Sequence, residues 1–216
     1  MRGLLQAFVG AWLPSRFKNF WLRRLGHEVP GSARVGMVLL SGQTRLSMGA
    51  RASIGHFNVI KDVGRVELGE DSVIGQWNWI TASTELVRKF GAPGRLTLGA
   101  HSAISSRHYL DCSGGIDIGA FTTVAGVRTT IFTHGIDWRD SAQKVTPVSI
   151  GDYVLMGSNA VIPPGGTVPD RAVVAMGTVI GKDSGEPGSL IAGPRAGVVK
   201  PSLTGAYFDR RRGYVA

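Results

Sequence analysis

Apolar residues between Val148 and Gly181 recur at every sixth position. A helix repeats its apolar positions at three and four residues, and a half-buried strand repeats them at two, so neither template fits. Period six is typical of a chain that turns a corner after each hexad, so that three sides make one coil of a parallel β-helix. The residues that open these hexads are Ile150, Met156, Ile162, Val168, Val174 and Ile180, with small residues four places later at Ala160, Gly166, Ala172 and Thr178.

A second pattern, apolar-any-apolar-glycine, marks the start of each coil, at 46–49, 66–69, 96–99, 116–119 and 148–151. Two intervals between coil starts are close to three hexads, whereas the other two are about ten residues longer. We therefore predict two insertions, residues 81–95 and 131–147, which both leave the prism at the same edge, after the third hexad. The inward residues of the earlier coils are expected to be Met48, Ile54, Ile60, Leu68, Ile74, Ile80, Leu98, Ile104, Leu110, Ile118, Val124 and Thr130.

Residues 1–26 contain no acidic residue and carry two amphipathic patterns that Pro14 separates. They predict two short helices, with Ser15 capping the second and Gly26 ending it. The pair can cap the open first coil or lie in a membrane interface; the cap is favoured, and the roles can coexist. No signal peptide or membrane-spanning segment is expected. The apolar faces comprise Leu4, Leu5, Phe8, Val9 and Trp12, and then Phe17, Phe20, Trp21 and Leu25.

The composition suits a globular chain of 216 residues, 43% of them hydrophobic. We divide it into an amphipathic segment (1–30), a β-helix domain (31–185) and a C-terminal extension (186–216). The single Cys112 excludes an intrachain disulfide, so we expect a cytoplasmic location, with association at the inner membrane face left open.

A net charge of +9 favours an anionic partner such as CoA or an acidic membrane. Nucleic acid is not expected, because the arginines are scattered and no binding motif is present.

Two insertions that leave one edge a layer apart are expected to wall a pocket over the coil between them. Cys112 is expected to be a packed side chain and not a nucleophile. For Glu85, Arg88 and Arg139, a merely solvated charge is the favoured interpretation. The candidate side chains are His108, Tyr109, Asp111 and Cys112 from the coil, Glu85 and Arg88 from the first insertion, and His134, Asp137 and Arg139 from the second.

The segments TIFTHGID (130–137), PVSIGDYVLMGSNAVIPPGGTVPDRAVVAMGTVIGKD (147–183) and SLIAGPRAGVVK (189–200) resemble the hexapeptide-repeat acyltransferases. This family includes maltose, galactoside and polysaccharide O-acetyltransferases, and the similarity covers roughly residues 46–200. The resemblance implies an all-β fold, a left-handed parallel β-helix. It also implies transfer of an acyl group from acyl-CoA to a hydroxyl of a sugar or glycan.

In this family the histidine of a TH-x-x-D motif is the general base, which corresponds to His134. Histidine suits the role because its pKa lies near neutrality. A carboxylate on its other ring nitrogen would fix the tautomer, and Asp137 and Asp111 are both candidates. No acyl-enzyme is required. A backbone N–H at a turn is the simplest donor to the oxyanion.

The resemblance further implies a CoA groove between subunits, and hence a homotrimer, with no resident metal. The acceptor pocket is expected to involve Arg107, His108, Tyr109, Glu85 and Arg88. The expected CoA contacts are Gly157, Ser158, Ala175, Met176 and Thr178, with Lys182, Arg195 and Lys200 near the phosphates.

Two other classes remain as alternatives. A trimeric metal-binding β-helix of the γ-carbonic-anhydrase kind would use histidines, and His101, His108 and His134 are available, although their spacing does not match that family's close pair. A non-catalytic basic scaffold is the second alternative. The polar insertion above an otherwise regular prism argues against it.

Overall fold

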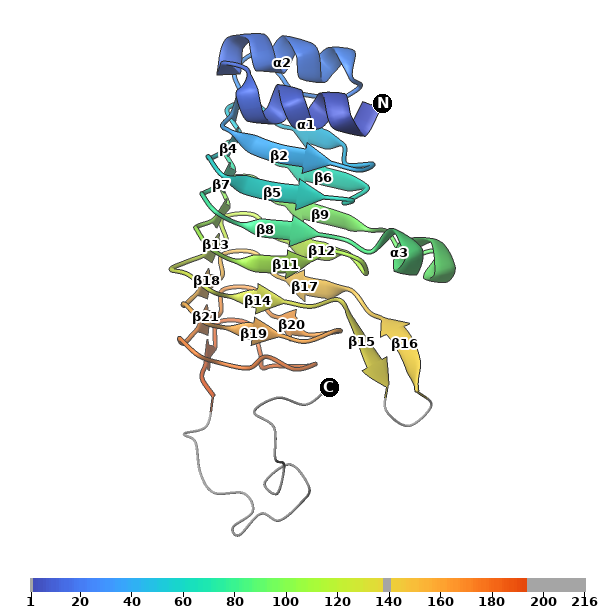
Figure 1. The fold of residues 1–216 in the computed structure, drawn as a ribbon. Helices are drawn as coiled ribbons and strands as arrows, with labels where there is room; N and C mark the ends of the chain where they lie inside the picture. The colour runs from blue at the N-terminus through green and yellow to red at the C-terminus, as the bar shows by residue number, and fades with distance from the viewer. Residues whose placement is uncertain (1, 138–140, 194–216) are drawn as a thin grey trace, which may run out of the picture.

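The computed structural model describes residues 2–137 and 141–193, which form a three-sided prism of stacked β-coils with two helices over its N-terminal end (Figure 1). The strands of each side pair in parallel with the strands of the neighbouring coils. Strands on the near face of Figure 1 run to the right and those behind run to the left while the chain descends, so the coil is left-handed. The predicted left-handed parallel β-helix is confirmed.

Each side of the prism is one parallel sheet. The first side contains β1 (Arg34–Val35), β4 (Ser53–Ile54), β7 (Val73–Ile74), β10 (Ala103–Ile104), β13 (Thr123–Val124), β18 (Leu155–Met156), β21 (Val173–Val174) and β22 (Leu190–Ile191). The second contains β2 (Val38–Ser41), β5 (Asn58–Lys61), β8 (Trp79–Thr81), β11 (Tyr109–Asp111), β14 (Thr130–Ile131) and β19 (Val161–Ile162). The third contains β3 (Leu46–Met48), β6 (Arg65–Leu68), β9 (Arg95–Leu98), β12 (Ile116–Ile118), β17 (Val148–Ile150) and β20 (Thr167–Val168).

The edges of the prism are named here by the sides they join. Edge I joins the first side to the second side, and edge II joins the second side to the third side. Edge III joins the third side of one coil to the first side of the next coil. The first side continues through β22 to Ile191, beyond residue 185, where the sequence analysis ends the β-helix domain.

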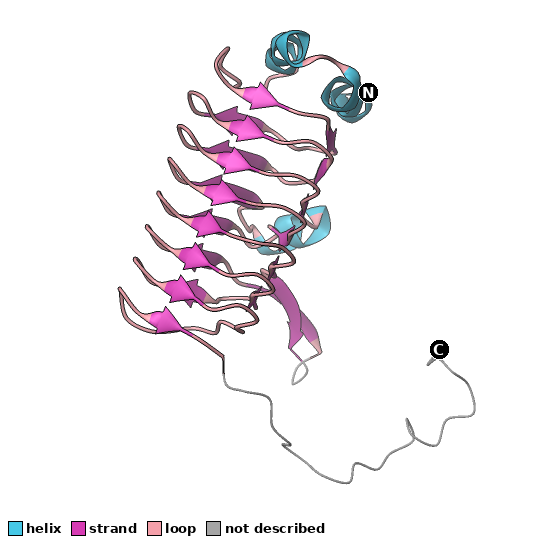
Figure 2. Ribbon diagram, turned by 90° about the vertical axis from the view of Figure 1, so that its left-hand side faces the viewer, coloured by secondary structure: helices cyan, strands magenta, loops and turns pink. Residues whose placement is uncertain are grey.

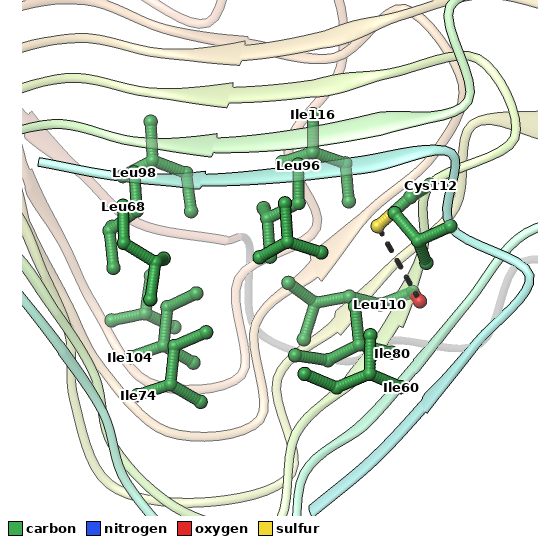
Figure 3. Packing of buried hydrophobic residues seen from close by; sticks show 14 of the residues in the cluster. Ile60, Leu68, Ile74, Ile80, Leu96, Leu98, Ile104, Leu110, Cys112 and Ile116 are labelled. Atoms are coloured by element: carbon green, nitrogen blue, oxygen red, sulfur yellow. Dashed lines mark hydrogen bonds between the residues drawn. The ribbon is translucent and has the colours of Figure 1, made fainter. Parts of the chain in front are cut away.

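The core is built of apolar columns in which equivalent residues of successive coils stack, and the third side contributes two of them, through Leu96 and Leu98 (Figure 3). Ile60, Ile80 and Leu110 form one such column, and the strand register places them opposite one another. All the predicted inward residues are buried except Thr130, whose place Ile131 takes. The prediction is off by one because the turn after Val124 holds an extra residue and bends twice, at Gly126 (φ 68°) and Arg128 (φ 64°).

The corners need glycine because successive coils pack closely, at about the 4.8 Å spacing of paired strands. A Cβ on Gly69 would lie against the backbone nitrogen of Ala100 in the next coil, and a Cβ on Gly99 would meet Ala120 in the same way. Two residues further on, the chain turns with a left-handed backbone, at Asp71 (φ 55°) in this coil and at the equivalent corner residues of the other coils. The apolar-any-apolar-glycine pattern therefore marks edge III.

Helices α1 (Arg2–Trp12) and α2 (Ser15–Arg24) cover the open first coil (Figure 2). The predicted break at Pro14 is confirmed, and Gly26 (φ 82°) follows the end of α2. The predicted capping role of Ser15 is wrong, because Pro14 takes the N-cap position and the helix begins at Ser15. Within the described residues, no helix has the length and apolar character needed to cross a membrane.

Both insertions leave the prism at edge II, as predicted, and lie on the same side of it (Figure 1). The first forms α3 (Thr84–Phe90), whose N-terminus is capped by Ser83 Oγ, which accepts a hydrogen bond from Leu86 N at 3.4 Å. The second forms an antiparallel hairpin of β15 (His134–Asp137) and β16 (Ala142–Val145). The hairpin places His134 at the point where the chain departs from the prism.

Candidate active site

His134 and Asp111 form a hydrogen-bonded pair at edge II, with 2.7 Å between His134 Nδ1 and Asp111 Oδ2. The Asp111 side chain is buried, and that of His134 is one third exposed. Because a carboxylate only accepts hydrogen bonds, the proton of the neutral ring is on Nδ1. Nε2 is then the ring nitrogen that can accept a proton from a substrate. A partly exposed imidazole oriented in this way is suited to act as a general base.

The Asp111 carboxylate is held by donors from two neighbouring coils. Ser113 donates to Oδ1 through its hydroxyl (2.6 Å) and its backbone N–H (3.2 Å). Thr133 donates to Oδ2 through its backbone N–H (2.9 Å), and its hydroxyl also lies 2.9 Å from that oxygen. Burial raises the pKa of Asp111, but the hydrogen bonds from Ser113, Thr133 and His134 outweigh it, so the pKa lies below its usual value. The buried aspartate is therefore ionised at neutral pH.

The two insertions wall a cavity of about 340 Å³ above the coil between them, as the sequence predicted. His134 is not itself among the lining residues, but it pairs directly with Val145, which lines the cavity, and paired residues project to the same face of a hairpin. The lining residues are Phe90, Ala92, Pro93, Arg95, Gly114, Asp117, Val145 and Pro147.

A larger groove, of about 950 Å³, lies elsewhere, between the helical cap and the first coils, away from the His134–Asp111 pair. We place the candidate chemistry in the smaller cavity. The hairpin that begins at the oriented His134 helps to wall this cavity, whereas neither insertion lines the larger groove.

Asp137, the other candidate for orienting His134, instead forms an ion pair with Lys144 across the hairpin, with 2.6 Å between Nζ and Oδ2. Successive residues of a strand point to opposite faces, so a residue three places along β15 faces away from its starting residue. Of the two predicted carboxylates, the structure therefore brings only Asp111 to the Nδ1 of His134.

Cys112 lies beside this pair but is fully buried. Burial, together with the charge of Asp111, raises the pKa of the thiol well above its usual value. A protonated, inaccessible thiol is a poor nucleophile, which agrees with the expected packing role.

His108 lies at edge I, not in the cavity at edge II, and belongs to a buried polar ladder. Asn58 Oδ1 accepts a hydrogen bond from Asn78 N (2.8 Å), and Asn78 Oδ1 accepts one from His108 N (2.9 Å). In the next coil, His108 Nδ1 accepts a hydrogen bond from Thr129 N (3.0 Å). The other ring nitrogen lies 2.9 Å from Ser105 Oγ. His108 thus takes the place of an asparagine in the ladder, and its predicted contact with the acceptor is not supported.

We expect His108 to make the fold sensitive to mild acid. Burial lowers the pKa of His108 to about 4, whereas the unfolded chain binds a proton near pH 6.5. As pH falls from about 6.5 to 4 only the unfolded state gains this proton, so the free energy of unfolding should fall by roughly 3 kcal/mol in total. Urea unfolding of the wild type and of His108→Asn at several pH values checks this. An unchanged pH dependence in His108→Asn would contradict it.

Four further candidates for acceptor binding lie outside the cavity lining. Arg107 occupies a left-handed turn (φ 61°) at edge I, and Tyr109 projects from the second side, with its ring 5.7 Å from that of Phe132. Glu85 and Arg88 are exposed on α3. Instead, the first insertion lines the cavity through Phe90, Ala92 and Pro93. Arg139 lies outside the described residues.

The expected CoA contacts cluster at edge I, on the other side of the second sheet from His134. Gly157 and Ser158 follow β18, and Ala175 and Met176 follow β21 in the same place one coil later. Thr178 is buried, and its hydroxyl donates to Ala175 O at 2.8 Å. Lys182 is exposed and lies beside Gly165, near the base of the hairpin. Arg195 and Lys200 fall outside the described residues.

Sequence reasoning missed two parts of the site. Ser113 and Thr133 hold Asp111, and both are short polar residues at coil positions that the hexad register could have aligned. The lining of the cavity also contains an ion pair in which Arg95 Nη2 lies 3.0 and 2.9 Å from the two carboxylate oxygens of Asp117. Arg95 is the last residue of the first insertion and the first of β9, and Asp117 lies in the next coil of the third side.

Among residues 2–137 and 141–193, no three His, Cys, Asp or Glu side chains are grouped closely enough to hold a metal ion. The histidines named for the metal-binding alternative lie at three different edges. His101 lies beside Phe121 at edge III, His108 is in the ladder at edge I, and His134 is at edge II.

Comparison with known proteins gives likenesses to acyltransferases. No family model matches the chain. The protein named "Putative acetyltransferase YvoF" of Bacillus subtilis (strain 168) is 39% identical over 61 residues, 28% of this chain. The match spans 34% of that relative's length. A solved structure of a mutant of AntD, an N-acyltransferase from Bacillus cereus, in complex with dTDP and coenzyme A, aligns over 81% of this chain and 82% of that one, at 15% identity and a TM-score of 0.34.

Proposed function

We propose that the protein is an acyl-CoA-dependent O-acyltransferase in which His134 is the general base and Asp111 orients it. The observation that carries the proposal is the His134–Asp111 pair at 2.7 Å, at the base of the hairpin that helps to wall a cavity built by both insertions. The likeness to a named acetyltransferase over 61 residues agrees with this class of reaction.

In the proposed reaction, His134 Nε2 takes the proton of the acceptor hydroxyl while the oxygen attacks the thioester carbon. Asp111 stabilises the resulting imidazolium through Nδ1, as a buried carboxylate does beside other catalytic histidines. The tetrahedral intermediate then expels the CoA sulfur, which receives the proton from His134. The acyl group thus moves directly to the acceptor, and no protein nucleophile is needed.

The position of the expected CoA residues supports a homotrimer. His134 lies at edge II, whereas Gly157, Ser158, Ala175 and Met176 lie at edge I. One prism therefore presents the base and the cofactor surface at different edges. If the edges of neighbouring copies meet around a threefold axis, edge II of one copy completes its site with edge I of the next.

This arrangement predicts complementation between two inactive variants. His134→Ala removes the base and Ala175→Trp blocks the cofactor surface, so each should be nearly inactive alone. In oligomers assembled from an equal mixture, about a quarter of the sites should combine an intact edge II with an intact edge I by random pairing. Measurement of the CoA released by the mixture checks this. Trimers without recovered activity, or a fully active wild-type monomer, would contradict the shared site.

The acceptor class is tested by measuring the release of free CoA from acetyl-CoA and longer acyl-CoAs with a panel of sugars and glycolipids. The proposal expects release that depends on a hydroxyl acceptor, with the acyl group recovered as an ester. Release that only amines support would make the protein an N-acyltransferase. No acceptor-dependent release from any acyl-CoA would favour the non-catalytic scaffold.

A further inference from the structure

The polarity of the helical cap is inverted relative to an ordinary surface helix pair. Its buried face carries Gln6, Lys18 and Asn19, and few apolar residues of the pair, chiefly Val9 and Leu22, are buried with them. Surface helices normally turn the apolar stripe toward the core and the polar face toward water. Here seven large apolar side chains are exposed: Leu4, Leu5, Phe8, Trp12, Phe17, Phe20 and Trp21.

The polar residues face inward because the first coil has an open edge, whose carbonyl groups have no further coil to pair with. Lys18 Nζ donates to Gly10 O (2.8 Å) and to Gly36 O. Asn19 Nδ2 donates to Ala33 O (2.8 Å), and Gln6 Nε2 donates to Gly42 O (3.1 Å). These contacts cap the prism without any of the seven exposed apolar side chains. The outward face is therefore unexplained by capping.

The outward face has the chemistry of a surface that contacts anionic lipid. Trp and Phe are typical of the boundary between headgroups and acyl chains. The Arg24 guanidinium lies 5.3 Å from the centre of the Phe20 ring, beside exposed Arg23. Residues 1–26 contain no acidic residue that would repel lipid phosphates. Trp12 and Phe17 are 74% and 66% exposed, which leaves them accessible to a partner.

The position of the pair also suits a flat partner. Both helices lie across the N-terminal end of the prism, while α3 and the hairpin project from its flank farther down (Figures 1 and 2). With 11 and 10 residues, α1 and α2 are too short to span a bilayer of about 30 Å. They can instead lie within the headgroup region.

We propose that the outward face of α1 and α2 binds the surface of an anionic phospholipid bilayer. The aromatic side chains enter the boundary between headgroups and acyl chains, and Arg24 pairs with lipid phosphates. The inner face of the same helices caps the β-helix, so both roles assigned to residues 1–26 coexist. This inference does not depend on the proposed acyl transfer.

The test is co-sedimentation of the full chain with vesicles of phosphatidylcholine alone or with about one third phosphatidylglycerol. The wild type should sediment with the anionic vesicles, and Phe8→Gln/Trp12→Gln should reduce the partition coefficient at least about tenfold. Arg24→Gln should reduce it about fivefold for anionic vesicles only. The matched control is Phe121→Gln/Tyr153→Gln, which removes two aromatic side chains of similar exposure at edge III and should bind like the wild type.

Thermal melting of each variant separates lost binding from lost folding. If the Phe8→Gln/Trp12→Gln protein melts early, the single Trp12→Gln replaces it, because this side chain is mostly exposed. A wild type that stays in the supernatant with anionic vesicles overturns the proposal, and so does an equal loss in the edge III control. If vesicles are not bound and Phe8→Gln/Trp12→Gln lowers the oligomeric state, the face is a contact between copies and the lipid proposal is wrong.

Discussion

Replacing His134 by alanine should lower acyl transfer by about 10²- to 10⁴-fold, the usual contribution of a positioned general base. The substitution removes the ring that Asp111 orients, and His108, the rival candidate base, lies at edge I. The affinity for acyl-CoA should change little, because the expected CoA contacts lie mainly at edge I. Steady-state turnover, with CoA affinity measured separately by calorimetry, checks both halves of this prediction.

The matched control is His108→Asn, because asparagine already fills the equivalent ladder position at Asn78. This variant should keep turnover near that of the wild type. If His108→Asn were nearly inactive while His134→Ala kept normal turnover, the base would belong to the wall of the prism and our assignment would be wrong.

Replacing Asp111 by asparagine should lower turnover by about 10²- to 10⁴-fold while preserving the shape of the site. An amide that donates toward Nδ1 makes this nitrogen the acceptor, so the proton moves to Nε2, the atom that must be unprotonated. The loss should appear in turnover, with the affinity for acyl-CoA little changed, and steady-state kinetics with calorimetry checks this. Turnover that stays near that of the wild type in a folded Asp111→Asn protein would contradict the orienting role.

The same substitution should also reduce stability at neutral pH, by about 1–3 kcal/mol for each buried donor of Ser113 or Thr133 that loses its acceptor. The lowered pKa of Asp111 means that its ionised form stabilises the folded state. This contribution is present above the ordinary pKa of aspartate and is lost as pH falls through the lower folded pKa. If Asp111→Asn does not fold, Thr133→Val, which removes one donor, should show a smaller loss of turnover in the same direction.

Much of the fold could be predicted because the β-helix repeats a local rule. An inward residue such as Ile104 or Leu110 is fixed by its place in the hexad, and the extra length between coils locates both insertions. Thr130 was misplaced because one added residue in the turn after Val124 shifts the register, and nothing in the hexad pattern marks which turn is longer.

The site was only partly predictable because its contacts depend on how coils stack. Asp137 lies close to His134 in sequence, but a separation of three along a strand turns the side chains to opposite faces. Asp111 is distant in sequence, yet the pairing of Leu110 with Ile131 brings it beside the hairpin. The inverted cap was not predictable, since amphipathicity does not reveal which face meets the open carbonyl groups of a coil.

The most direct test of the proposed reaction is a single-turnover experiment with acetyl-CoA labelled in its acetyl group and an accepted hydroxyl substrate. We predict that the label passes to the acceptor as an ester as fast as CoA is released, that no label remains on the protein, and that His134→Ala slows both events equally. Label held covalently on the protein before it reaches the acceptor, or CoA release without an ester product, would contradict direct transfer by the His134–Asp111 pair.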